Sequence, residues 1–123
     1  PRIKLAQGST VVIVDDQSMI HQLWKLRLDD AGFTGKILFF QNARDLRSGI
    51  GGMSIDGVHF LMDYDLLDPQ VNGIDLLKEI PAAASRYLVT GHFDDPNVRA
   101  ACERERLALI PKTSLHSLPV VVV

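Results

Sequence analysis

The sequence has little cysteine, little net charge and no long apolar run. Cys102 is the one cysteine among 123 residues, which excludes an intrachain disulfide and fits a reducing compartment. Its neighbours 98–101 resemble a helix core, so we expect a small buried hydrophobe rather than a reactive thiol. The formal net charge of −2 excludes the positive surface that nucleic-acid binding requires.

The sequence also lacks membrane and export signals. No apolar segment is long enough to span a bilayer, and the first residues do not resemble a signal peptide. We therefore expect a cytoplasmic protein with no membrane partner. The length suits one domain, residues 1–123. Because the chain begins with Pro1 rather than Met, we expect a piece excised from a longer multidomain protein, or a processed start.

Short apolar runs alternate with helical patterns about five times. This alternation predicts an α/β fold, a doubly wound five-stranded parallel sheet with helices on both faces. The last helix should be short, because the valines at 120–123 are poor helix formers. The expected strands are 10–14, 36–40, 58–63, 86–89 and 107–110, and the expected helices are 17–31, 43–47, 74–80 and 96–106.

Polar side chains follow these strands at the point where each one ends. Right-handed crossovers bring the carboxyl ends of parallel strands to one edge of the sheet, so these side chains should converge. Taken singly, each has an ordinary explanation as a cap, a turn residue or a solvated charge. Their joint occurrence favours a site. The residues are Asp15 and Asp16, Asp63 and Asp65, Thr90, and Lys112.

Clustered carboxylates repel one another unless a cation lies among them. Oxygen ligands of this kind suit Mg²⁺. A metal-bound aspartate beside a lysine and a threonine hydroxyl is a phosphoryl-binding arrangement, in which the aspartate attacks phosphorus in line.

The chain resembles a response regulator receiver domain of two-component signalling, similar to the chemotaxis receiver, over nearly its whole length. The resemblance implies a flavodoxin-like sheet with strand order 2-1-3-4-5. It rests on an ordered set of matches, each at a strand end or a helix start. They are residues 12–16, Asp63, Gly73, residues 89–91 and residues 110–113.

The resemblance implies a signalling domain rather than a turnover enzyme. It would accept a phosphoryl group from a histidine kinase or a phosphotransfer protein, dephosphorylate slowly, and pass the signal to an output domain elsewhere in a longer chain. The implied roles are Asp63 as phosphoacceptor, Asp16 as direct and Asp15 as water-mediated Mg²⁺ ligand, the Asp65 carbonyl as a further ligand, and Thr90 and Lys112 as phosphoryl contacts.

The sequence departs from the family pattern at several points. Gly73 follows Asp63 by ten residues instead of eight, so the loop carries an insertion around 67–70. Leu109 occupies the position of the usual switch aromatic. Asp65 and His92 flank the site, where Asp65 would tighten Mg²⁺ binding or orient a hydrolytic water. We interpret His92 as an exposed loop residue.

Other side chains receive structural or partner interpretations. We expect His59 to be buried and hydrogen-bonded, and His21 to lie at the surface. Met19 and Leu26 fall off the apolar face of their helix and should be exposed. For partner contact we favour Gln17, Met19 and the loop 66–72.

Two other functions stay open. Asp63-Tyr64-Asp65 also resembles the first motif of haloacid-dehalogenase-type phosphatases, in which the second aspartate is a general acid/base. Against this, two strand-helix units precede Asp63, and Asp15 and Asp16 come before rather than after Lys112. The third interpretation is a receiver-shaped interaction module that is never phosphorylated.

Overall fold

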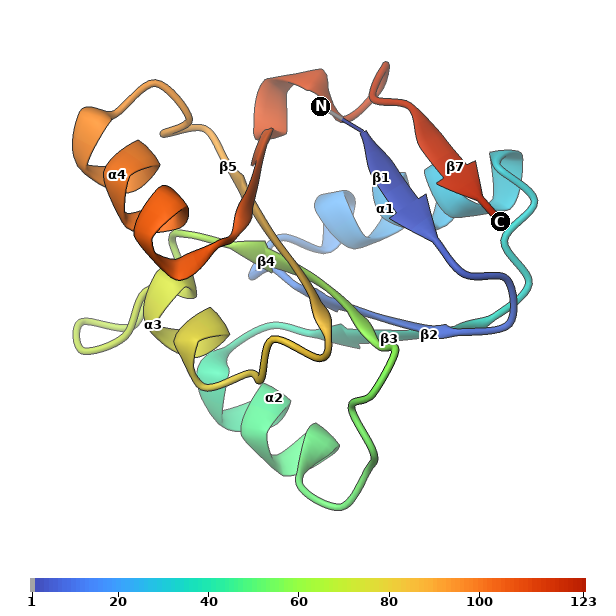
Figure 1. The fold of residues 1–123 in the computed structure, drawn as a ribbon, viewed down its shortest axis with the longest axis horizontal. Coiled ribbons are helices and arrows are strands. Elements are labelled where there is room, and N and C mark those ends of the chain that lie inside the picture. Colours follow the sequence, from blue (N-terminus) through green and yellow to red (C-terminus); the bar gives the residue numbers. More distant parts are fainter. Residues whose placement is uncertain (1) are drawn as a thin grey trace.

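A computed structural model describes residues 2–123. Its centre is a parallel sheet of five strands in the order β3-β2-β4-β5-β6, so the predicted five-stranded parallel sheet is confirmed (Figure 1). Numbering only the strands of this sheet along the chain, the order reads 2-1-3-4-5. The strands are β2 (Thr10–Val14), β3 (Lys36–Phe40), β4 (His59–Asp63), β5 (Ser85–Thr90) and β6 (Ala108–Pro111).

Both faces of the sheet are covered. Along β2, Val12 and Val14 point into one core and Val11 and Ile13 into the other, because successive side chains of a strand alternate in direction. Burial on both faces explains why these strands appear in the sequence as unbroken apolar runs. The first core is closed by α2 (Ala43–Ile50), α3 (Gly73–Lys78) and α4 (Pro96–Glu105), and the second by α1 (Ser18–Asp30).

A second, two-stranded parallel sheet lies over the same face as α1. It pairs β1 (Ile3–Leu5) with β7 (Val120–Val122), so the two ends of the chain lie side by side (Figure 1). Ile3 and Leu5 are fully buried and join the core that contains Trp24. The sequence patterns did not predict this ribbon. The only signal for β1 is the alternation of apolar and polar side chains at 3–5, which is too short to be distinctive. Its partner strand lies at the opposite end of the chain.

The prediction of a short last helix is wrong. After β6 the chain makes one 3-10 turn, η1 (Lys112–Ser114), and then enters β7. Pro119 has no N–H to donate within a helix, and the valines that follow are β-branched, which favours an extended backbone. β1 supplies the hydrogen-bonding partner that makes a strand stable here.

Three helices, α2, α3 and α4, begin at side-chain caps, whereas α1 has no side-chain cap at Gln17. Asn42 accepts the N–H of Asp45 at the start of α2, and Asn72 and Asp75 form a reciprocal capping box at the start of α3. α2 continues to Ile50, three residues beyond its predicted end. None of the helices described combines the length and apolar character needed to cross a membrane.

Candidate phosphoacceptor site

The carboxyl ends of two strands bring together a largely buried acidic cluster. Asp15 and Asp16 follow β2, and Asp63 ends β4. Each offers one carboxylate oxygen, and these oxygens lie within 4.8 Å of one another. Asp15 and Asp63 are only 3% and 5% exposed, so little water screens their charges.

Lys112, from the end of β6, lies between two of these acids. Its Nζ is 2.8 Å from Asp15 Oδ2 and 3.3 Å from Asp63 Oδ2. The other oxygen of Asp15 accepts the main-chain N–H of Gln17 at 2.9 Å. Burial disfavours the charged form of Lys112, but the hydrogen bond to Asp15 and the charges of both acids outweigh it, so the pKa of Lys112 is raised.

The Asp63 carboxylate lies in an environment that disfavours its negative charge. Burial raises its pKa, the neighbouring Asp15 carboxylate raises it further, and Lys112 opposes both, so the pKa of Asp63 is about 6. The main-chain N–H of Asp65 also donates to the Asp63 carboxylate. A single lysine therefore does not fully compensate the negative charge of this site.

The donor set fits Mg²⁺. Three carboxylates converge within ligand range of one point, and hard oxygen ligands of this kind are what Mg²⁺ prefers. Asp16, Asp63 and Lys112 line one opening of about 340 Å³, which is large enough for an ion with its waters and phosphate oxygens. Gln17, Asp65, Leu67 and Gly91 complete its lining.

Thr90 lies at the same edge of the sheet, one residue beyond Val89, the β5 residue paired with Asp63. Its side chain is fully buried. The Thr90 hydroxyl accepts the main-chain N–H of His92 at 3.0 Å, so it is engaged with its own loop. In this structure Thr90 is therefore placed near the acidic cluster without a hydrogen bond to it.

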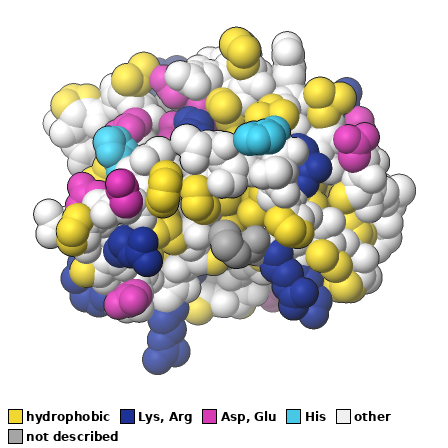
Figure 2. Space-filling model, turned by 90° about the horizontal axis from the view of Figure 1, so that it is seen from above, with side chains coloured by type: hydrophobic (Ala, Val, Ile, Leu, Met, Phe, Trp, Pro, Cys, Tyr) yellow, Lys and Arg dark blue, Asp and Glu magenta, His cyan; other side chains and the backbone are white. Residues whose placement is uncertain are grey.

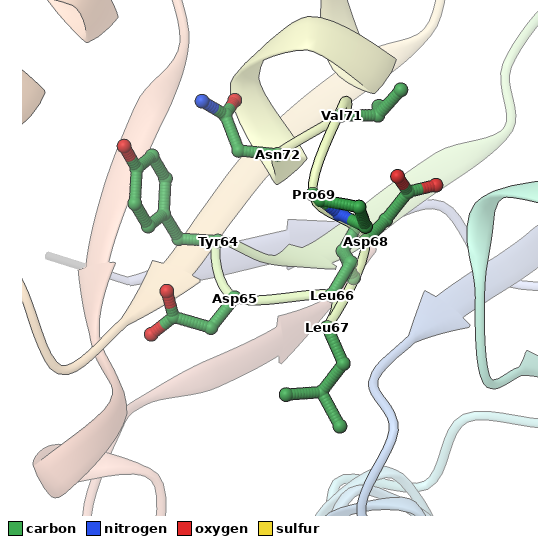
Figure 3. Close-up of a pocket in the computed structure, with 8 residues that line it drawn as sticks. All are labelled: Tyr64, Asp65, Leu66, Leu67, Asp68, Pro69, Val71 and Asn72. Atoms are coloured by element: carbon green, nitrogen blue, oxygen red, sulfur yellow. The ribbon is translucent and has the colours of Figure 1, made fainter.

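Asp65 and His92 form a pair beside the cluster. His92 Nε2 is 2.9 Å from Asp65 Oδ2, and the His92 ring meets that of Tyr64 edge-on at 5.6 Å. In Figure 3 the Asp65 side chain points away from Asp68 and Val71. The prediction that His92 is an exposed loop residue is confirmed, and its ring in addition contacts both residues that follow Asp63.

The inserted loop forms a rim beside the site. The main-chain N–H of Gly73 donates to the Tyr64 carbonyl at 2.9 Å, which closes the loop tightly. A Cβ on residue 73 would lie 2.0 Å from the carbonyl oxygen of Asp63, so only glycine fits. Leu67 adopts φ 55 and is 84% exposed. The loop borders a wide depression of about 600 Å³ (Figure 3).

Several other predictions have a structural outcome. Met19 and Leu26 are exposed and Cys102 is buried, as expected. His21 is not a free surface group, because its Nε2 lies 2.7 Å from the Asp15 carbonyl oxygen and its ring stacks on Phe39. This contact with Asp15 was not predicted from the sequence, although His21 lies in the first turn of α1, close to Asp15 along the chain.

Leu109, where the resemblance led us to expect an aromatic residue, is partly buried against the core that α4 helps to close. It lies on β6, beside Leu88 on β5.

Comparisons with known proteins agree on the fold. No protein-family model matches the sequence, and no curated protein matches it. Among solved structures, the non-phosphorylated receiver domain of the stress response regulator RcsB from Escherichia coli is 16% identical with a TM-score of 0.75, covering 90% of this chain and 86% of that one.

Two further receiver domains are similar. A response regulator receiver domain from Rhodospirillum rubrum is 20% identical, with a TM-score of 0.67, and covers 87% of this chain and 88% of that one. The receiver domain of the histidine kinase CKI1 from Arabidopsis thaliana is 16% identical, with a TM-score of 0.65 and coverages of 88% and 83%. The chain thus has the fold of response regulator receiver domains.

Proposed function

We propose that this chain is a phosphoacceptor receiver domain of a two-component phosphorelay. The observation that carries the proposal is the convergence of three carboxylates and one lysine at the carboxyl edge of a receiver-type sheet. The carboxylates Asp15 and Asp63, from different strands, share the ammonium of Lys112. No core-packing requirement explains burying these charges together, whereas phosphoryl transfer to one of them does.

In the proposed reaction, an Asp63 oxygen attacks the phosphorus of a phosphohistidine on a histidine kinase or a phosphotransfer protein. A P–O bond to Asp63 forms as the P–N bond breaks, and the donor imidazole keeps the electron pair of the broken bond. Lys112 already faces Asp63 Oδ2 and would neutralise a phosphoryl oxygen. The main-chain N–H of Asp65 orients the attacking carboxylate.

Mg²⁺ would be held by Asp16 and Asp63, by Asp15 through water, and by the Asp65 carbonyl, and when bound it would supply charge neutralisation. These residues fit because all of their donors are oxygens and three of them already converge.

The signalling step would begin at Thr90. Its hydroxyl oxygen accepts the N–H of His92, so a shift of this hydroxyl toward a phosphoryl group on Asp63 would carry the 90–92 loop with it. Leu109 cannot report this change as an aromatic ring would, because it has no ring to exchange positions with the Thr90 hydroxyl. The output would then pass through the loop and α4 to an output domain of the full-length protein.

The test uses acetyl phosphate with Mg²⁺ as the phosphoryl donor. We expect the wild-type chain to take up one phosphoryl group per molecule, in an acid-stable bond that hydroxylamine cleaves. Asp63→Asn should take up none, while Asp68→Asn, a matched change in the loop, should behave as wild type. Beryllofluoride with Mg²⁺ should shift the amide signals around Asp63 and Thr90.

A second assay, with a small phosphate ester as substrate, separates the alternatives together with the uptake measurement. Sustained hydrolysis of a small phosphate ester would favour the haloacid-dehalogenase-type enzyme, with Asp65 as its acid/base. No phosphate uptake and no beryllofluoride response would instead favour an interaction module that is not phosphorylated.

A further inference from the structure

His92 connects the Thr90 hydroxyl to three other groups of the chain. Its main-chain N–H donates to Thr90 Oγ1 at 3.0 Å, and its carbonyl accepts the N–H of Asp95, the cap residue of α4, at 3.1 Å. Its ring nitrogen Nε2 lies 2.9 Å from Asp65 Oδ2, and the ring meets that of Tyr64 edge-on. A displacement of the Thr90 hydroxyl would therefore reach Tyr64 through the His92 ring.

The Tyr64 side chain lies between two hollows of the surface. It borders the depression of about 600 Å³ beside the inserted loop, and it also lines a groove of about 330 Å³ between α3 and α4. Figure 3 shows the Tyr64 ring turned away from Leu67 and Val71, on the same side as Asp65. A ring with open space on two sides can occupy more than one rotamer, so its contact with His92 helps to decide which one it adopts.

The groove between α3 and α4 begins at the edge of the sheet that carries the acidic cluster. α3 follows the loop after β4, and α4 follows the loop after β5. The buried residues of its lining are Ile74 of α3 and Val98 of α4, and Tyr64 packs against the same core. Tyr64 follows Asp63 directly in the chain, so it connects the groove to the proposed phosphoacceptor by the shortest covalent path.

The other tyrosine, Tyr87, has a structural role. Its hydroxyl lies 3.5 Å from the Lys4 carbonyl oxygen, and its side chain packs against the core beneath the ribbon of β1 and β7. Figure 2 looks onto the side of the molecule that carries this ribbon and shows apolar side chains in a band across its middle. Since β6 carries Leu109 where an aromatic residue was expected, Tyr64 is the tyrosine placed to respond to the acidic cluster.

We propose that Tyr64 reports phosphorylation of Asp63 to the groove between α3 and α4, with His92 as the link. In the unphosphorylated chain the edge contact with His92 holds the Tyr64 ring. When the Thr90 hydroxyl shifts toward the phosphoryl group, the His92 ring moves with its main chain and leaves Tyr64, whose ring then changes rotamer at the border of the groove. The inference rests on the proposed function and names the regulation of that site.

Nuclear magnetic resonance with beryllofluoride and Mg²⁺ tests the proposal. In the wild type we expect shifts of the Tyr64 ring signals and of the Lys78 and Ala101 amides, because both residues line the groove and neither lines the opening at Asp63. Tyr64→Leu should lose the shifts of Lys78 and Ala101 and keep those of Asp63 and Thr90. Tyr64→Phe, which keeps a ring, should keep all of them.

A second variant tests the link. His92→Ala retains the main-chain N–H that bonds to Thr90 but has no ring, so it should lose the shifts of Lys78 and Ala101. The exposed His116 provides the matched control, and His116→Ala should respond as wild type does. The His92 side chain is 52% exposed, so its replacement tests the link even if Tyr64→Leu fails to fold.

The outcomes separate this inference from the proposed function. If Asp63 and Thr90 respond while the Tyr64 ring, Lys78 and Ala101 do not, the inference is wrong and the proposed function stands. Equal responses of Lys78 and Ala101 in wild type and in Tyr64→Leu or His92→Ala would also overturn it, because the signal would then pass along the main chain alone. A chain in which neither Asp63 nor Thr90 responds would contradict the proposed function and this inference with it.

Discussion

The Asp63 carboxylate, which the proposed function requires, lowers the stability of the folded chain. It is 5% exposed and lies beside Asp15, and its pKa of about 6 exceeds the ordinary aspartate value of 3.8. An acid whose pKa is raised on folding destabilises the fold in its ionised form. This cost is absent below about pH 4, grows between about pH 4 and pH 6, and is complete above about pH 6.

The first prediction concerns the removal of this charge. At pH 7.5 without divalent metal, Asp63→Asn should raise the free energy of unfolding by about 1–3 kcal/mol, because the buried repulsion with Asp15 is lost. Urea denaturation measures the gain, which should shrink at pH 4.5, where Asp63 of the wild type is protonated. A variant less stable than wild type at pH 7.5 would contradict this account of the cluster.

The second prediction concerns the pair of Asp65 and His92. The Asp65 carboxylate lines the opening beside Asp63, and His92 Nε2 holds it at 2.9 Å. If it orients the attacking water, Asp65→Asn should lengthen the lifetime of the aspartyl phosphate several-fold. Loss of phosphate after donor removal measures this, with Asp68→Asn as the control. An unchanged lifetime would show that Asp65 acts through its main chain alone.

At the residue scale, the sequence predicted the placement of those side chains whose position is determined by the order and direction of the strands. Asp15, Asp16, Asp63 and Lys112 each end a strand, and parallel strands end at one edge, so their meeting needed no side-chain detail. The contact of His92 with Asp65 lies between two loops. Loop conformation depends on turn geometry and rotamers that no periodic pattern encodes, so the sequence named both residues but not their pairing.

At the element scale, the ribbon replaces the expected last helix. The local signal against a helix was present, since Pro119 and the valines after it favour extended backbone. The partner strand was not evident, because residues 3–5 and 120–122 are separated by nearly the whole chain. Pairing at such a separation is decided by tertiary packing, here the burial of Ile3 and Leu5 over α1.

His59 attaches this ribbon to the central sheet. It is 7% exposed, its Nε2 accepts the Ala6 N–H, and its Nδ1 has no partner among the described residues. Burial lowers the pKa of His59 below 6.5. The protonated ring would place an N–H against the Ala6 N–H. A folded pKa below the unfolded value gives stability that is present above about pH 6.5 and is lost as the pH falls.

The third prediction follows from that sign. Below pH 6.5, His59 should lower the free energy of unfolding of the wild type by at most about 1.4 kcal/mol for each pH unit. His59→Val should lack this loss. Denaturation curves of both proteins from pH 7.5 to pH 5 measure the effect. The contribution of Asp63 cancels in the difference, because Asp63 titrates in both proteins. The exposed His116 provides the matched control, and His116→Gln should keep the wild-type difference. A variant with the same pH dependence as wild type would exclude His59 as its source.

At the scale of the whole molecule, the fold concentrates negative charge at one edge and leaves its neutralisation incomplete. Two strands and the loops after them supply the acids, and a third strand supplies the single lysine. We expect a divalent cation at this edge to stabilise the whole chain, because it would bind the folded cluster and not the dispersed unfolded acids.

The fourth prediction measures that linkage. Millimolar Mg²⁺ should raise the unfolding free energy of wild type by about 1–3 kcal/mol at pH 7.5, with a gain that grows with the logarithm of its concentration. Asp16→Asn should lose most of the gain, since Asp16 belongs to the cluster, while the exposed Asp56→Asn should keep it. Chelation should return wild type to its metal-free stability. Equal stabilisation of all three proteins would show that Mg²⁺ acts by general screening. In that case the cluster would be a strained acidic edge without a metal site, and phosphoryl transfer would have to proceed with Lys112 as its one cation.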